Sequence, residues 1–169
     1  MTLTACIPSL RRTLPDPLAI DCWPEYTTAS TTDVTIAGVS LLRLVDWCGT
    51  PCVHTAAAVI PGTNGRPSDT ELASVIVTRV QSVSSASDGG LVIEVDADLR
   101  GCCGVLSEVR LIGRASIAHT VSVRVPMSDG MALDLPGDVH PGDLIAVPCL
   151  GVTRRHDVVQ EPLETHCGR

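Results

Sequence analysis

Residues 73–95, ASVIVTRVQSVSSASDGGLVIEV, decide the fold class. Val75, Val77 and Val80 lie in one run of β-prone residues, and residues 91–95 form a second run. Between the runs, Asp88-Gly89-Gly90 is a turn sequence, because glycine accepts the backbone angles of tight hairpin turns. The stretch therefore predicts a β-hairpin and a mainly β protein.

The rest of the chain adds short strands and one helix. Apolar residues recur at helical spacing in residues 40–48, and Gly49 follows where a glycine ends a helix. Several short strands with few helical runs predict a closed or nearly closed barrel. We therefore expect a single small β-barrel over residues 33–157 with one short helix. The expected strands are 33–37, 52–60, 73–80, 91–95, 105–112, 116–125 and 144–149.

The two ends of the chain differ from this pattern. Residues 1–32 contain Pro8, Pro15, Pro17, Pro24 and a run of Thr and Ser, which predicts an extended N-terminal arm outside the core. Residues 158–169 are polar and are expected to form a loose tail. Neither end has an apolar run suited to a signal peptide or a membrane span, so we expect a cytoplasmic protein.

Composition excludes several classes of partner. The net charge of −7 disfavours binding to nucleic acid or to an anionic membrane. Phe is absent, so aromatic platforms for stacking bases are scarce. The eight cysteines are expected to be reduced thiols. Cys48, Cys52 and His54 have the spacing of half a metal site, but no second cluster completes four ligands, and small apolar filling is the preferred interpretation.

Two stretches carry a resemblance to a known family. The first is VTIAGVSLLRLVDWCGTPCVH at residues 34–54. The second runs over residues 60–158 and includes IPGTNGRP at 60–67 and LPGDVHPGDLIAVPCLGV at 135–152. Together they resemble the β-domain of the fold-type III PLP-dependent decarboxylases, the family of diaminopimelate and ornithine decarboxylases. The (β/α)8 barrel of that family would stand between residues 58 and 60 and is missing.

The departures from this family determine the expected chemistry. Its enzymes hold pyridoxal phosphate as a Schiff base on a lysine, and this chain has no lysine. The glutamate of the family's phosphate loop falls at Ile60, and its terminal tyrosine falls at Thr153. Its Cys-Glu-Ser-Gly-Asp motif corresponds to residues 126–130, where cysteine and glutamate are lost. We therefore expect no cofactor and neither decarboxylase nor racemase activity.

The resemblance also suggests where a ligand would bind. In the family, the loop equivalent to residues 126–131 faces the substrate, and the loop equivalent to residues 96–100 lies near the cofactor. A carboxyl or imidazole group there could act as a general acid or base if its pKa were shifted. Simpler alternatives exist for each candidate. The aspartates could be turn residues that bond to their own backbone, and His119 could be a strand residue with satisfied hydrogen bonds. Arg100 and Arg114 could be solvated at the surface. The candidate catalytic residues are Asp96, Asp129 and His119, the candidate substrate-binding residues are Arg100, Met127, Ser128 and Met131, and no metal site is expected.

Three hypotheses for function follow. In the first, the barrel encloses an apolar small molecule and promotes a cofactor-free cyclisation or isomerisation in specialised metabolism, by positioning the substrate. In the second, the chain is a non-catalytic relative of the decarboxylases that binds another protein, and the family's architecture implies a homodimer. The third is a structural remnant. An open interior cavity would favour the first, and a filled barrel with an apolar outer patch would favour the second.

Overall fold

Strand β5 (Pro67–Ser85) is the longest strand and organises the molecule. The computed structural model describes residues 2–126 and 132–159. Val75, Ile76 and Val77 of β5 are fully buried although their side chains alternate between the two faces of the sheet. Ile76 faces the barrel interior, and Val75 and Val77 face a second apolar cluster on the outside. The continuous apolar run in β5 is therefore explained by burial on both faces.

The hairpin that the sequence predicts is present. β5 pairs with β6 (Leu91–Val95) in antiparallel register from Ser85↔Leu91 to Val80↔Val95, with a bulge between Val80 and Ser82. The predicted strand at residues 144–149 is also confirmed as β10 (Leu144–Cys149), which pairs with the first half of β5.

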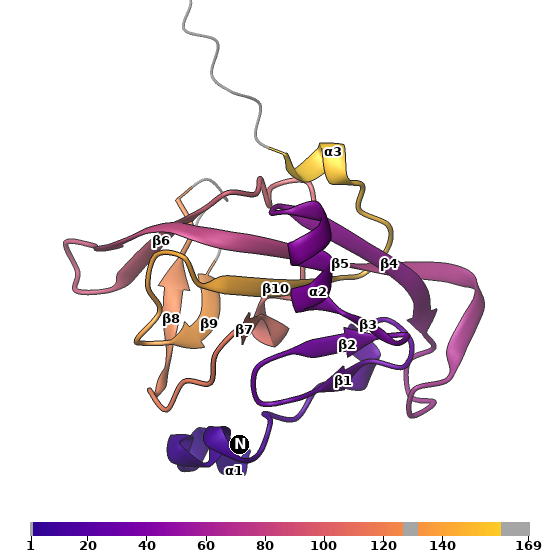
Figure 1. Cartoon of the computed structure of the whole chain (residues 1–169), viewed down its shortest axis with the longest axis horizontal. Coiled ribbons are helices and arrows are strands. Elements are labelled where there is room, and N and C mark those ends of the chain that lie inside the picture. Colours follow the sequence, from indigo (N-terminus) through magenta and orange to yellow (C-terminus); the bar gives the residue numbers. More distant parts are fainter. Residues whose placement is uncertain (1, 127–131, 160–169) are drawn as a thin grey trace, which may run out of the picture.

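These strands belong to a nearly closed mixed barrel (Figure 1). The hydrogen-bonded order is β7-β10-β5-β6-β8-β9, and β4 extends the sheet from β5. The β6–β8 pair is parallel, whereas the other pairs are antiparallel. The remaining strands of this sheet are β4 (Cys52–Val59), β7 (Arg110–Ile112), β8 (Thr120–Arg124) and β9 (Ala132–Pro136).

Apolar side chains fill the barrel. They come from β5, β6, β8, β9 and β10, from the segment directly after β6 and from the residue before β7. Close packing of branched side chains is the usual state of a small barrel interior. The described interior is thus a core. Its buried members are Ile76, Val80, Ile93, Val95, Ala97, Leu99, Val109, Val123, Val125, Leu133, Leu135, Val139, Ile145, Val147, Cys149 and Val158.

Helix α2 (Leu41–Cys48) lies on the outside of the barrel and confirms the predicted helix. Ser40 caps its N-terminus by accepting from the Arg43 N–H, and Gly49 ends it with a φ of +69°. The Asp33 carboxylate accepts from the Leu42 N–H at 3.2 Å and from the Ser40 hydroxyl, which fixes the helix start. A small sheet of β1 (Thr28–Ala29), β2 (Val34–Ile36) and β3 (Val39–Ser40) lies next to α2.

The N-terminal segment is more ordered than an extended arm. It contains helix α1 (Leu3–Cys6) and the short 3-10 helices η1 (Pro8–Arg12) and η2 (Ile20–Cys22). Trp23 is 1% exposed and belongs to the apolar cluster between α2 and β5. The expectation that this segment stays outside the core is corrected at Trp23, because the indole has a large apolar surface and its N–H donates to Glu108 at 3.2 Å.

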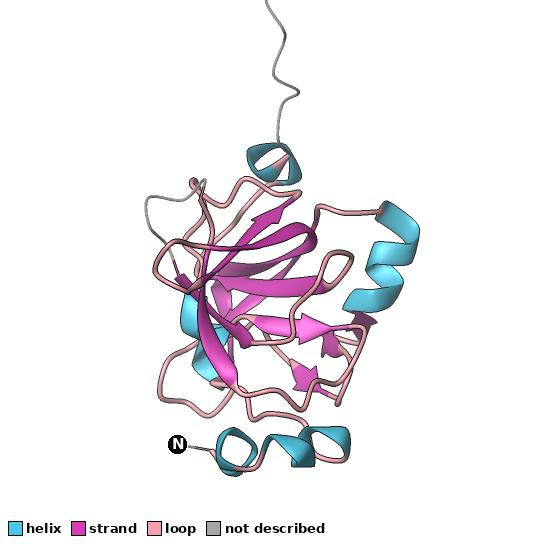
Figure 2. Cartoon of the chain, turned by 90° about the vertical axis from the view of Figure 1, so that its left-hand side faces the viewer, coloured by secondary structure: helices cyan, strands magenta, loops and turns pink. Residues whose placement is uncertain are grey.

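Two other predicted elements are shorter than expected. The run 105–112 contains a 3-10 turn, η3 (Leu106–Glu108), before β7, and the run 116–125 is a strand only from Thr120. Helix α3 (Arg155–Val158) precedes the tail, and Val158 packs in the barrel core. In both views, α3 lies at one end of the molecule and the N-terminal helices at the other (Figures 1 and 2).

Candidate functional site

Four of the predicted site residues lie outside the described residues. These are Met127, Ser128, Asp129 and Met131. The parallel pairing of β6 with β8 directs the ends of both strands to one end of the barrel. Asp96 follows β6 and Pro126 follows β8 at that same end.

Asp96 is hydrogen-bonded to β5 next to the bulge of the hairpin. Its carboxylate accepts a hydrogen bond from the Thr78 hydroxyl at 2.6 Å and from the Arg79 N–H at 2.8 Å. The Asp96 N–H in turn donates to the Arg79 carbonyl at 3.0 Å. Thr78 is fully buried, so its hydroxyl needs this acceptor. The contacts give Asp96 a structural role across the hairpin bulge.

Arg100 is bound to a carboxylate of its own loop. Its Nε donates to the two oxygens of Asp98 at 2.9 and 3.1 Å, and 57% of its side chain is exposed. The hydrogen bonds from Arg100 lower the pKa of Asp98. A ligand carboxylate at Arg100 would therefore compete with Asp98.

His119 is separated from the other candidates. It is exposed and precedes β8, whereas the sequence placed it within a strand between apolar neighbours. Next to His119, the Ala118 carbonyl accepts a hydrogen bond from Arg11 of the N-terminal segment at 2.8 Å. Near Asp96, the Asp98 N–H donates to the Val158 carbonyl of α3. The register Leu91↔Val123 places His119 and Asp96 about 30 Å apart along the strands, at about 3.3 Å per residue. The two residues therefore do not form one site.

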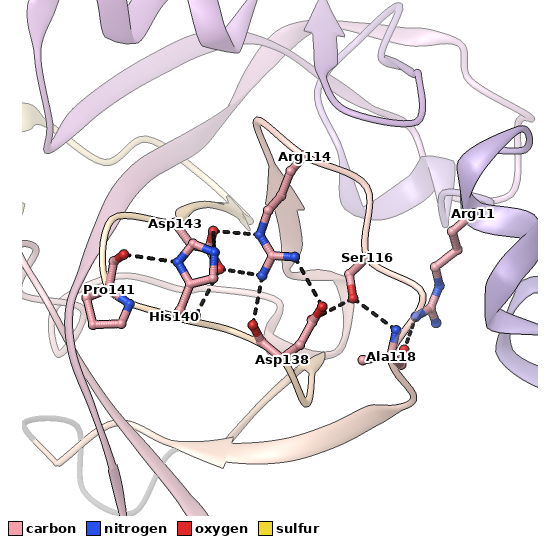
Figure 3. A network of polar contacts seen from close by, with 8 residues as sticks. All are labelled: Arg11, Arg114, Ser116, Ala118, Asp138, His140, Pro141 and Asp143. Carbon is pink, nitrogen blue, oxygen red and sulfur yellow. Dashed lines mark hydrogen bonds and ion pairs between the residues drawn. The ribbon is translucent and has the colours of Figure 1, made fainter.

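Arg114 belongs to an internal network (Figure 3). Its Nε and one terminal nitrogen donate to the two oxygens of Asp143 at 2.8 and 2.7 Å, and its other contacts reach Asp138. Asp138 also accepts from the Ser116 hydroxyl at 2.6 Å. The bonds to Asp143 raise the pKa of Arg114. Arg114 fixes the turn before β10 and is not a solvated surface cation.

An apolar groove lies outside the barrel. Its volume is about 380 Å³, within the range of about 300–1,000 Å³ usual for small-molecule sites. Four segments form it: η2 with Trp23, the end of β4, the first half of β5 and the loop after β10. The groove residues are Asp21, Cys22, Trp23, Ala58, Val59, Pro61, Glu71, Leu72, Ala73, Leu150, Gly151 and Val152.

The groove combines exposed apolar side chains with two acids. Leu72, Leu150 and Val152 are 49%, 58% and 57% exposed, which leaves apolar surface in contact with water. Asp21 and Glu71 carry negative charge, and no cationic residue among the described ones lines the groove. The Asp21 carboxylate accepts from the Gly62 N–H at 3.0 Å, which holds it in place. This arrangement suits an apolar group that bears a positive charge.

No pattern in the sequence predicts this groove. Its walls come from segments as far apart as Asp21 and Val152, so no spacing in the sequence marks them. The one local signal was the pair Leu150 and Val152 around Gly151, which continues an apolar strand into an exposed loop.

A second cleft of about 260 Å³ lies between the N-terminal segment and the barrel. Its arginine side chains are bonded to other groups of the protein. Arg11 lies 2.9 Å from the Asp16 carboxylate, and Arg110 donates to the backbone carbonyls of Asp16, at 2.8 Å, and Pro17. Burial lowers the pKa of Arg110. The cleft is therefore best explained as the attachment of residues 2–17 to the barrel.

Cys48, Cys52 and His54 of the sequence cluster lie in different environments. No group of three or more His, Cys, Asp or Glu side chains suited to a metal ion occurs among the described residues. Cys52 is buried, and burial raises its pKa to about 11. Burial also lowers the pKa of His54, whose Nε2 has no hydrogen-bond partner. Cys48 is exposed, so apolar filling describes Cys52 only.

Comparisons with known proteins add no identity. The sequence matches no family model, and no curated protein matches it. Within residues 2–126 and 132–159, no helix is long and apolar enough to span a membrane. Function is therefore inferred from the geometry of the chain.

Proposed function

We propose that this protein binds an apolar small molecule bearing a positively charged group, in the apolar groove. The observation that carries the proposal is the pairing of exposed Leu72, Leu150 and Val152 with the carboxylates of Asp21 and Glu71 around one hollow. The proposal keeps the apolar ligand that the sequence led us to expect. It assigns that ligand to the outside of the barrel and not to the interior, because side chains fill the described interior.

The groove supplies two kinds of binding energy. Covering apolar surface contributes about 0.8 kcal/mol for each buried CH₂ group. Each exposed ion pair adds about 0.2–1 kcal/mol, so the two carboxylates together favour an amine over an alcohol by about 2- to 30-fold. A ligand carboxylate is repelled and binds more weakly than either.

The groove is better suited to binding than to acid–base catalysis. Its ionisable side chains among the described residues are Asp21, Glu71 and Cys22. Burial, together with the charges of Glu108 and Asp21, raises the pKa of Cys22. The raised pKa keeps the Cys22 thiol neutral at pH 7, so this side chain does not serve as a base or nucleophile. A cyclisation or isomerisation would then depend on positioning of the substrate alone.

The proposal keeps the decarboxylase β-domain as the origin of the barrel but excludes that family's cofactor chemistry. Pyridoxal phosphate requires a lysine for its Schiff base, and the chain has none. The residues do not fit the cofactor, so no step is assigned to it. Seven free cysteines in the described residues agree with a reducing compartment, and we propose a cytoplasmic location.

The experiment uses Trp23 as a reporter. Trp23 lines the groove, whereas Trp47 is 69% exposed and contacts Arg43, so Trp47→Phe leaves one tryptophan at the groove. Octylamine, octanol and octanoate are titrated below their aggregation limits while Trp23 fluorescence is measured. The proposal predicts saturable changes with affinities in the order octylamine, octanol, octanoate. Equal affinities, or no saturable change with octylamine, would refute it.

Matched substitutions locate the binding. Leu150→Arg places a cation beside Asp21 and Glu71 and should weaken octylamine binding at least about tenfold. Ile117→Arg adds the same charge at a residue that is 45% exposed and does not line the groove, and it should leave binding unchanged. Equal effects of the two substitutions would point to a general charge effect.

A second candidate is a homodimer formed through the same surface. Leu72, Leu150 and Val152 would be covered by a second copy, because exposed apolar patches commonly mark protein interfaces. Light scattering at micromolar concentration should then show a dimer that Leu150→Arg converts to a monomer. A monomer that still binds octylamine would support the small-molecule function and exclude the dimer as its basis.

A further inference from the structure

The wall of the groove formed by η2 and Trp23 is fixed to the end of β4. Pro24 and Ala58 form an isolated antiparallel bridge, and the Glu25 N–H donates to the Ala57 carbonyl at 2.8 Å. Trp23 is 1% exposed and is the largest side chain of the groove. The backbone just after Trp23 is therefore held by β4, but these bonds do not fix the indole ring or the start of η2.

Glu108 holds the other side of this wall. One of its carboxylate oxygens, Oε2, accepts from the Trp23 indole N–H at 3.2 Å and from the Ala19 N–H at 3.0 Å. Ala19 is the N-cap of η2, so the second bond fixes the start of this helix. Because Trp23 is buried, its indole N–H needs an acceptor, and Glu108 provides it.

Glu108 itself lies outside the groove. It belongs to η3, is half-buried and does not line the hollow. Two positions further along the chain, Arg110 donates to the carbonyls of Asp16, at 2.8 Å, and Pro17. The segment from η3 to β7 thus holds residues 16–23 at both their start and their end.

The position of η2 also sets the arrangement of charge in the groove. Asp21 is the middle residue of η2, and its carboxylate accepts from the Gly62 N–H at 3.0 Å. A shift of η2 would move Asp21 relative to Glu71 on β5, and a rotation of Trp23 would change the apolar lining of the hollow. Glu108 therefore acts on both features that favour an apolar cation, without lining the hollow itself.

We propose that Glu108 is a positioning residue for the groove, because its hydrogen bonds to Ala19 and Trp23 hold η2 and the indole ring in the arrangement that binds the ligand. The inference rests on the proposed function of the groove. Coupling between two sites is reciprocal. A ligand in the groove should therefore strengthen the bonds at Glu108 as much as these bonds strengthen ligand binding.

Substitutions at Glu108 separate its hydrogen bonds from its charge. The parent protein carries Trp47→Phe, so that Trp23 is its only tryptophan. Glu108→Leu removes the acceptor and should weaken octylamine binding at least about fivefold, the low end of typical coupling between sites. Glu108→Gln removes the same charge but keeps a carbonyl oxygen as acceptor, and affinity should stay within about twofold of the parent. Affinities are measured from the methyl resonances of Leu72 in NMR titrations.

The matched control is Glu94 on β6. Its carboxylate accepts from the Ser82 hydroxyl at 2.8 Å, and its side chain is exposed and does not line the groove. Glu94→Leu removes one charge and one acceptor, as Glu108→Leu does, and should change octylamine affinity by less than about twofold. The indole N–H resonance of Trp23 adds a spectroscopic signature. Glu108→Leu should speed the exchange of this proton with solvent, whereas Glu108→Gln and Glu94→Leu should keep it slow.

Hydrogen exchange in the parent protein tests the coupling without any change at Glu108. It decides the question even if Glu108→Leu fails to fold. Saturating octylamine should slow exchange of the Trp23 indole N–H and of the Ala19 N–H at least about fivefold, because the coupling is reciprocal. The control is the Ala86 N–H, which donates to the Gly90 carbonyl at 2.8 Å in the hairpin turn. Its exchange should change by less than about twofold.

The outcomes distinguish this inference from the function on which it rests. If octylamine does not bind the parent protein, the proposed function is refuted, and the positioning role with it. If octylamine binds but neither Glu108→Leu changes its affinity nor octylamine slows exchange at Trp23, the positioning role alone is wrong. Equal losses of affinity with Glu108→Gln and Glu108→Leu would overturn positioning in favour of a charge effect.

Discussion

Replacing Asp96 by alanine should destabilise the protein strongly. The substitution removes the acceptor for the Thr78 hydroxyl and the Arg79 N–H, at 2.6 and 2.8 Å. Hydrogen bonds to a charged group contribute about 1.5–3 kcal/mol each, and the fully buried Thr78 hydroxyl would lose its partner. Because Asp96 is only half-buried, the lower values apply, and we expect a loss of about 3 kcal/mol.

The assay is urea denaturation at pH 7 followed by circular dichroism. The urea concentration at the midpoint of unfolding should fall. The slope of the unfolding free energy against urea concentration should stay constant, because the surface exposed on unfolding does not change. In a domain of this size the loss corresponds to a Tm lower by about 6–12 °C. Asp96→Asn keeps one acceptor oxygen and should cost about 1 kcal/mol.

The control is Asp134→Ala on strand β9, where the side chain is exposed. Its effect should stay within about 0.5 kcal/mol. If Asp96→Ala also changes stability by less than about 0.5 kcal/mol, the structural role of Asp96 is wrong. A proton-transfer role in a ligand site would then be the better explanation of this residue.

Three further outcomes are expected. Arg114→Ala leaves the Asp143 carboxylate, 4% exposed, with only its contacts to His140 and should cost about 3–5 kcal/mol in urea denaturation, whereas a smaller loss than for Asp96→Ala would contradict the network. The pKa of His54 in the folded protein lies below its ordinary 6.5, so the unfolded chain binds more protons and stability should fall as pH drops below about 6.5. His54→Gln should lack this part of the pH dependence of stability. An equal slope of stability against pH in both proteins would refute the prediction. Incubation with pyridoxal phosphate followed by borohydride should attach no pyridoxyl group to any side chain, as measured by peptide mass spectrometry, since the chain has no lysine.

The parts of the fold that the sequence predicts are those fixed by local patterns. The hairpin of β5 and β6 follows from β-prone runs on either side of Asp88-Gly89-Gly90, and α2 follows from apolar spacing with Gly49 at its end. These elements carry their own start and stop signals.

The parts that were missed depend on distant contacts. Trp23 is buried because it packs beside α2 and β5, which nothing in its own proline-rich segment indicates. The strand predicted from residue 116 begins at Thr120, because the preceding segment turns at Gly113, with φ +91°, and Ser116 bonds to Asp138.

The candidate site shows the same limit more strongly. Arg114 pairs with acids 24 and 29 positions further along the chain, and the groove is built from four separate segments. The resemblance to the decarboxylases led to the end of the barrel with Asp96 and Arg100, where the described side chains are bonded to their own neighbours. A ligand site made by exposed apolar residues has no sequence motif to reveal it.

The most direct test of the groove is the position of a bound amine. Octylamine is titrated into isotope-labelled protein, and NMR chemical-shift changes of methyl groups are mapped. The proposal predicts saturable shifts at Val59, Leu72, Leu150 and Val152, with the methyl groups of the barrel interior unchanged. Shifts confined to the end of the barrel with residues 96–100, or shifts that rise without saturating, would contradict it.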